Sequence, residues 1–258
     1  MARIFRIMTA ALVSLSTSDS RGPGYLLVPP AGGTLRAFDP LAGAADADVR
    51  GAEYPGHGER LAESPASSLE ELGTVLAAAT PKAWFSRSVT IGFGMGAFVA
   101  LEAAQRLGVA PGALIVVDAC APQRRSPDKN AKAGASALGR VFGRTGLTPV
   151  AGYRDSPESW EYALDLLLGD LQLLNAYRGP ARTRLSCPIA AIRGIDDPAS
   201  ASGDDATGGW RVWTSGPFVG RAVPGGYLGV LESGRETEFW ARIRRLEAAF
   251  VNAEPEVA

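Results

Sequence analysis

Short apolar runs alternate with longer amphipathic stretches along most of this chain. A short apolar run bounded by Gly, Pro or charged residues is typical of a buried β-strand, whereas apolar residues spaced three and four apart predict a helix. Strands are predicted over residues 24–28, 49–54, 88–92, 113–117, 189–193 and 218–223. Helices are predicted over residues 67–79, 97–107, 157–177 and 235–251, with Ser68 capping the first. This alternation predicts an α/β fold in which helices cover a mainly parallel sheet.

The chain has 258 residues and no internal repeat, so we expect a single domain over residues 1–258. Residues 123–150 are rich in Arg, Gly, Ser and Pro, a composition typical of a loop or a mobile cap. Together with the helix that follows, they predict a helical lid inserted into the domain over approximately residues 123–178.

The beginning of the chain contains an apolar run at residues 8–15, preceded by Arg3 and Arg6. This run loosely resembles a short signal peptide, but no clear small-x-small cleavage site follows it, so we interpret it as a first strand. No stretch approaches the roughly 18 apolar residues of a membrane helix. We therefore expect a soluble cytoplasmic protein without a membrane partner, in which Cys120 and Cys187 are reduced.

The charge balance and the counts of metal-binding residues exclude several classes of function. Lys and Arg number 26 against 27 Asp and Glu, giving a net charge of −1, and nucleic-acid binding would normally show a basic excess. Two cysteines and one histidine are too few for a disulfide scaffold or a multi-histidine metal centre. We expect no metal and no cofactor, and any mechanism that needs a histidine must use His57.

A glycine-rich turn joins the predicted strand 88–92 to the predicted helix 97–107. Its sequence is Gly92-Phe93-Gly94-Met95-Gly96, in the strand–turn–helix context of a G-x-S-x-G nucleophile elbow. The spacing does not match the G-x-G-x-x-G dinucleotide fingerprint or a P-loop. The nucleophile position holds Gly94, which has no side chain. A simpler interpretation is that these glycines only permit close packing of the strand against the helix.

Several further segments follow one another in a specific order and spacing. They are Leu27–Gly33, the Y-P-G-H-G-x-R run Tyr54–Arg60, Phe93–Ala97, the L-x-C-P-I run Leu185–Ile189, Gly194–Pro198 and the P-G-G-Y run ending at Tyr227. Together they resemble the type II thioesterases of polyketide and nonribosomal peptide assembly lines, which belong to the α/β-hydrolase superfamily. The resemblance extends over nearly the whole chain and implies an α/β-hydrolase fold.

Carried over residue by residue, the resemblance implies an incomplete catalytic triad. Gly94 stands where the family has its serine, and Tyr227 stands where it has its histidine. The acid is implied at Asp197, or at Asp196 if the register differs by one. Tyrosine titrates near about 10 and is a poor base at neutral pH. Loss of two triad members indicates a protein that no longer hydrolyses an acyl-enzyme.

Asp118 is a further candidate, because it ends an apolar strand at the sheet edge where the triad acid should emerge. A buried carboxyl there, with Asp197 and Tyr227, would form an acid–base group. A helix cap or a solvated loop residue is an equally good interpretation of Asp118. His57 is favoured as structural, and Cys120 as a small buried apolar group.

The elbow and the first loop predict the remaining site residues. Backbone N–H groups near Ala31 and Met95 would stabilise an oxyanion, and Phe93 and Gly94 would contact the substrate.

Three functions remain open. The first is a repurposed enzyme that performs cyclisation, dehydration or isomerisation on a polyketide-like small molecule or acyl chain, free or held on an acyl or peptidyl carrier protein. The second is a non-catalytic protein that binds a carrier protein or an intermediate. The third is a weak residual hydrolase that uses a water in place of serine. The substrate and the oligomeric state stay open.

Overall fold

The computed structural model describes residues 11–16, 22–125, 157–180, 184–197, 207–226, 228–231 and 234–252. Within these ranges, seven strands form one sheet in the order β1-β3-β2-β4-β5-β6-β7. The strands are β1 (Leu12–Ser16), β2 (Tyr25–Val28), β3 (Val49–Ala52), β4 (Val89–Phe93), β5 (Ala113–Val117), β6 (Ile189–Gly194) and β7 (Phe218–Val223). The α-helices are α1 (Asp39–Ala44), α2 (Leu69–Ala79), α3 (Lys82–Phe85), α4 (Met95–Leu107), α6 (Pro157–Ala176) and α7 (Glu236–Asn252). Short 3-10 helices are η1 (Leu35–Phe38), η2 (Gly58–Arg60), η3 (Pro122–Arg124), η6 (Gly208–Trp213) and η7 (Gly229–Leu231).

The sheet is parallel from β3 through β7, and β1 pairs antiparallel with β3 at one edge. The predicted α/β fold with a mainly parallel sheet is therefore confirmed, and each predicted strand overlaps one of β2 to β7. The described part of the run at residues 8–15, which we interpreted as a first strand, overlaps β1 over residues 12–15. Because the strands from β2 to β7 share one direction, their carboxyl ends meet at the same edge, where such sheets bind their ligands.

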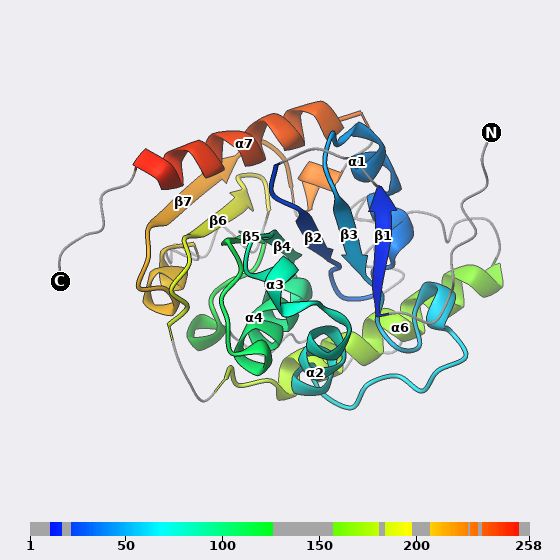
Figure 1. Ribbon diagram of the computed structural model, residues 1–258. Coiled ribbons are helices and arrows are strands. Elements are labelled where there is room, and N and C mark those ends of the chain that lie inside the picture. The colour runs from blue at the N-terminus through cyan, green and yellow to red at the C-terminus, as the bar shows by residue number, and fades with distance from the viewer. Residues whose placement is uncertain are drawn as a thin grey trace.

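Helices cover both faces of the sheet (Figure 1). α1 and α7 lie on one face, and α2, α3 and α4 lie on the other. Successive side chains of a strand point to opposite faces. Leu26 and Val28 of β2 accordingly join the core under α2 and α4, whereas Leu27 joins the core under α7. Each face of the central strands is therefore apolar, as the uninterrupted apolar runs predict.

The helix boundaries follow local chemistry. Ser68 Oγ accepts a hydrogen bond from Glu71 N–H at 3.1 Å, and α2 begins at the next residue after this predicted cap. The sequence pattern does not predict α1 and α3, because helices of six and four residues are too short to show a period. The lid insertion stays a prediction, because much of the interval 123–178 lies outside the described residues. No described helix is both long enough and apolar enough to cross a membrane.

Candidate active site at the carboxyl edge of the sheet

The predicted turn between β4 and α4 is built around Gly94. This residue has φ 50° and ψ −114°, a conformation that is costly for any residue with a side chain. Its N–H donates to the Val117 carbonyl at 2.8 Å, which ties the end of β4 to the end of β5. A Cβ on Gly92 would overlap the backbone of Ala97, so glycine is needed for α4 to lie this close to β4. The turn has the backbone of a nucleophile elbow and no side chain at its apex.

Two loops bring backbone donors to the elbow. A Cβ on Gly96 would overlap the Val28 carbonyl, so the first turn of α4 lies directly against the chain that leaves β2. Ala31 follows in that chain and packs against the same core cluster as Met95. Among the described residues, no acceptor is bonded to the backbone N–H of Ala31 or of Met95. Unpaired N–H groups at a helix N-terminus and a facing loop are what an oxyanion site requires.

Asp118 connects three segments at the same edge. Its Oδ1 accepts from Gly194 N–H at 2.7 Å, and its Oδ2 accepts from Leu228 N–H at 2.8 Å. Asp118 and Leu228 are also the two non-glycine residues of the described chain with a left-handed backbone, at φ 50° and φ 54°. Strained conformations of this kind cluster at functional sites. Asp118 is therefore a partly buried residue held by two backbone donors, and its role as an acid–base group stays a prediction.

The surroundings of Asp118 place its titration near neutral pH. Burial raises the pKa of this carboxyl to about 6, although the bonds from Gly194 and Leu228 lower it. The negative charge of Asp197 raises the pKa further, and the positive charge of Arg193 lowers it. A carboxyl with this pKa can both accept and release a proton at physiological pH.

The two neighbouring acids after β6 have different environments. Asp196 is exposed, and its Oδ2 accepts from Gly225 N–H at 3.2 Å. Asp197 is half-buried, and its charge acts on Asp118. The structure thus brings Asp118 and Asp197 together at one edge of the sheet, while Tyr227 lies outside the described residues.

Phe93, which we expected to contact the substrate, lies elsewhere. Its ring is fully buried in the core under α7, with ring centroids 5.1 Å from Phe38 and 6.1 Å from Phe239. Side chains of a strand alternate between faces, so the residue before Gly94 points away from the elbow's open side.

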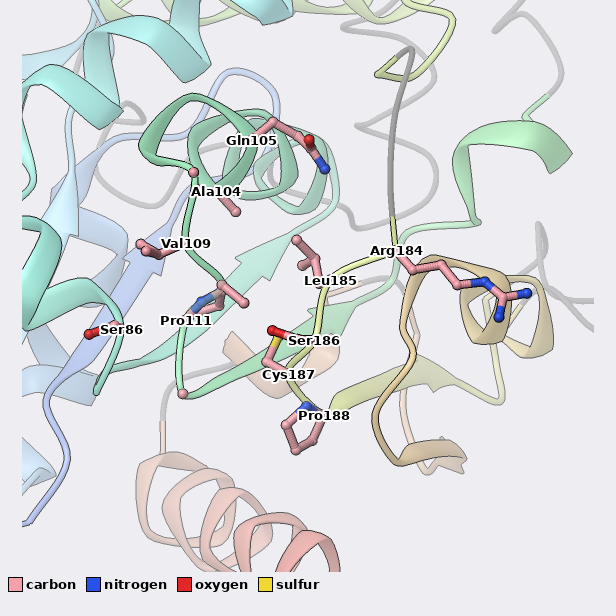
Figure 2. A pocket seen from close by; sticks show the side chains of 13 residues that line it. Ser86, Ala104, Gln105, Val109, Pro111, Arg184, Leu185, Ser186, Cys187 and Pro188 are labelled. Carbon is pink, nitrogen blue, oxygen red and sulfur yellow. The ribbon is translucent and has the colours of Figure 1, made fainter. Parts of the chain in front are cut away.

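Both cysteines are free, and neither has the character of a nucleophile. Burial raises the pKa of the half-buried Cys120 thiol, and it raises the pKa of the Cys187 thiol to about 12. Cys187 lines an open cavity of about 760 Å³ at the amino ends of β5 and β6, the edge opposite Gly94. Figure 2 shows this cavity between the chain after α4, with Val109 and Pro111, and the chain before β6. Its position separates it from the elbow.

A buried cluster of titratable side chains next to the first loop was not predicted from the sequence. His57, favoured as structural, is 3% exposed, and its Nε2 lies 3.1 Å from Oδ2 of Asp170 on α6. Glu53, at the end of β3, is 2% exposed. The sequence did contain a signal for Asp170. It lies three residues after Leu167, on the apolar face of α6, where an acidic residue indicates a buried carboxyl group with a partner. Among the described residues, no group of three or more His, Cys, Asp or Glu is arranged to hold a metal ion.

The chain matches the thioesterase domain family over residues 26–246. It is 32% identical over 185 residues to the thioesterase PikA5 of Streptomyces venezuelae, covering 68% of this chain and 63% of that protein. It is 28% identical over 205 residues to a probable cadicidin biosynthesis thioesterase of Streptomyces griseus, covering 78% of this chain and 56% of that protein. This chain thus spans less than two thirds of the length of these curated relatives.

Solved structures resemble this one over most of its length. The type II thioesterase BorB from the borrelidin biosynthetic cluster superposes with a TM-score of 0.76 at 26% identity, covering 93% of this chain and 96% of BorB. The thioesterase RedJ from the prodiginine pathway of Streptomyces coelicolor superposes with a TM-score of 0.74 at 25% identity, covering 88% and 89%.

Proposed function

Because this chain belongs to the thioesterase domain family, we propose that it acts on an acyl chain of polyketide or nonribosomal peptide origin without forming an acyl-enzyme. The acyl chain is presented as a thioester on an acyl or peptidyl carrier protein. Similarity to type II thioesterases of the borrelidin and prodiginine pathways supports this substrate class.

The observation that carries the proposal is Gly94 at the apex of the elbow. An acyl-enzyme needs a side-chain nucleophile at this position, and glycine supplies none. The resemblance to type II thioesterases also puts Tyr227 where an imidazole base is expected. Without the nucleophile and the base, the Ser-His-Asp route is closed.

The groups that remain support proton transfer. Asp118, with a pKa of about 6, accepts a proton from the carbon next to the thioester carbonyl. The carbonyl oxygen then carries the negative charge, and the backbone N–H groups of Ala31 and Met95 stabilise it. Asp197 and Tyr227 complete the acid–base group. The enolate carbon then attacks a second carbonyl of the same chain, which takes up the proton (cyclisation), or expels a β-hydroxyl group that takes up the proton and leaves as water (dehydration), or is reprotonated so that a double bond shifts (isomerisation). In each case the proton returns from Asp118, and no bond to the protein is made.

One observation favours a second candidate, a non-catalytic protein that binds the loaded carrier. Both carboxylate oxygens of Asp118 already accept backbone N–H groups, from Gly194 and from Leu228. An Asp118 confined to holding these two segments would leave the site without a base.

Hydrogen exchange at the substrate separates the candidates. Acyl-pantetheine thioesters and acyl-loaded carrier protein are incubated with the protein in D₂O, and mass spectrometry follows deuterium at the α-carbon, free acid and the mass of the protein. We expect deuterium uptake, no acylated protein and little free acid. Uptake should be lost in Asp118→Asn and kept in the control Asp165→Asn, an exposed acid on α6.

Two other outcomes of this experiment would support a different function. Binding of the loaded carrier without deuterium uptake establishes the second candidate. Rapid release of free acid that Asp197→Asn abolishes would overturn the proposal in favour of a hydrolase. We also expect the double variant Gly94→Ser with Tyr227→His to gain thioester hydrolysis, because the elbow backbone is already in place.

A further inference from the structure

A buried carboxylate joins α6 to the loop after β2. Oδ2 of Asp170 accepts from Gly32 N–H at 2.7 Å, and the Asp170 side chain is almost fully buried. Gly32 has φ 68°, and a Cβ there would lie 3.0 Å from the Leu167 Cβ, so the loop and the helix meet without an intervening side chain. Ala31 packs against the cluster that Leu164, Leu167 and Leu171 form on α6. The segment that carries the Ala31 N–H is thus set by its contact with α6.

The partners of His57 determine its protonation. Nδ1 lies 3.0 Å from the Pro55 carbonyl oxygen, which can only accept a hydrogen bond. Nε2 lies 3.1 Å from Oδ2 of Asp170, the same oxygen that accepts from Gly32. The Pro55 carbonyl makes Nδ1 a donor. A second proton on Nε2 would make His57 an imidazolium paired with the Asp170 carboxylate, and the raised pKa of His57 favours this form.

The charged groups around His57 are Asp170 on α6 and Glu53 at the end of β3. Burial lowers the pKa of His57, but the hydrogen bond and the charge of Asp170 outweigh it, and the pKa lies above its ordinary value. Burial raises the pKa of Glu53 to about 7. The nearby Arg60 guanidinium is bonded to Glu63 and to the Glu53 carbonyl, not to the ring.

We propose that Asp170 is a positioning residue of the active site. Held by the imidazolium of His57, it fixes the loop of residues 29–33 against α6 and so sets where the Ala31 N–H lies. The positioning role rests on the proposed function in one respect, which is that the Ala31 N–H stabilises the oxyanion.

Through the protonation of His57, the hydrogen bonds that hold the loop of residues 29–33 depend on pH. Below the pKa of folded His57 the Nε2 proton is present, and Asp170 is held from two sides. As the pH rises through that pKa, Nε2 becomes an acceptor facing a carboxylate. The Gly32 N–H then remains as the one donor to Oδ2 among the described groups, and the loop loosens.

The single histidine of the chain makes the first test direct, because every histidine NMR signal comes from His57. In protein labelled with ¹⁵N-histidine, we expect both ring nitrogens to be protonated at pH 6.5 and the titration midpoint to lie above 6.5. The midpoint should fall in Asp170→Asn. It should be unchanged in the matched control Asp165→Asn, an exposed acid on the same helix. A midpoint at or below 6.5, or the same midpoint in Asp170→Asn, would overturn the proposal.

The second test measures the loop itself by NMR hydrogen exchange at the Gly32 amide. We expect its protection factor in the unmodified protein to fall about tenfold as the pH passes the His57 midpoint, and to be low at all pH values in Asp170→Asn. The titration of the unmodified protein needs no variant to fold. Protection that does not follow the His57 titration contradicts the coupling.

Neither the His57 titration nor the Gly32 amide exchange depends on deuterium uptake at the α-carbon of the substrate. The positioning role of Asp170 and the proposed chemistry can therefore be refuted independently. Loss of the His57–Gly32 coupling with Asp118-dependent deuterium uptake would remove only the positioning role. Intact coupling without uptake would remove only the proposed chemistry.

Discussion

Glu53 carries a buried carboxyl at the end of β3 and provides a test of the electrostatics around the first loop. The side chain is 2% exposed, and its Oε1 accepts from Leu35 N–H at 3.3 Å. Burial raises its pKa from the ordinary 4.5 to about 7, because the charged form loses its hydration. Replacement by glutamine keeps the shape and one acceptor oxygen and removes the titration.

The sign and size of the effect follow from linkage. Between pH 4.5 and about 7 the folded protein holds a proton on Glu53 that the unfolded chain has lost, so its stability falls as the pH rises through this range. Each pKa unit corresponds to about 1.4 kcal/mol, so the full range corresponds to about 3 kcal/mol. Between pH 5 and pH 8 we expect the unmodified protein to lose about 2.5 kcal/mol more than Glu53→Gln.

Urea unfolding of both proteins at pH 5 and pH 8, followed by circular dichroism, measures this difference. Contributions from groups far from Glu53 cancel because both proteins share them. The contribution of His57 differs between them, because the Glu53 charge raises the His57 pKa, so the His57 titration is measured in both proteins. Glu161→Gln, at an exposed position on α6, should behave like the unmodified protein. Equal loss of stability in Glu53→Gln and the unmodified protein would refute the reasoning, since it would mean that the Glu53 carboxyl titrates normally in the fold.

Two further predictions concern packing. Gly96→Ala should lower the melting temperature strongly or prevent folding, because its Cβ would overlap the Val28 carbonyl; Gly43→Ala, where a Cβ meets nothing within 4 Å, should fold normally. Comparable melting curves for the two variants would contradict the close contact at the elbow. Trp240→Phe should cost about 1–3 kcal/mol in urea unfolding, because the buried indole N–H of Trp240 donates to a backbone carbonyl of α1 at 2.7 Å. Trp213→Phe, at a more exposed indole, should cost less, and the reverse order would count against the role given to Trp240.

The sequence predicted those features of the fold that depend on neighbours along the chain. The short apolar runs located the strands β2 to β7. The signal is strongest for β2 and β5, which are buried on both faces and therefore apolar throughout. The run Gly92 to Gly96 predicted the turn, since the absence of side chains at its two ends is what allows α4 to approach β4 and the chain after β2. The place of Asp118 at the ligand-binding edge followed from its position after an apolar strand.

The sequence pattern was less informative about where single side chains go. Val89, Ile91 and Phe93 alternate with Thr90 and Gly92, so the period of two places Phe93 on one face with Val89 and Ile91. The pattern does not show which helices cover that face. In the structure Phe93 lies in the core under α7, away from the candidate site.

Contacts between distant segments depended on tertiary structure alone. Asp118 meets Gly194 and Leu228, which lie 76 and 110 positions further along the chain. His57 meets Asp170 across 113 positions. Local periodicity reports only which residues share a face of one element, so it cannot show which faces of different elements meet. The histidine count limited the available mechanisms, and the motif at Gly94 removed the nucleophile. Packing of α6 against the first loop decided that the one histidine is buried beside Asp170.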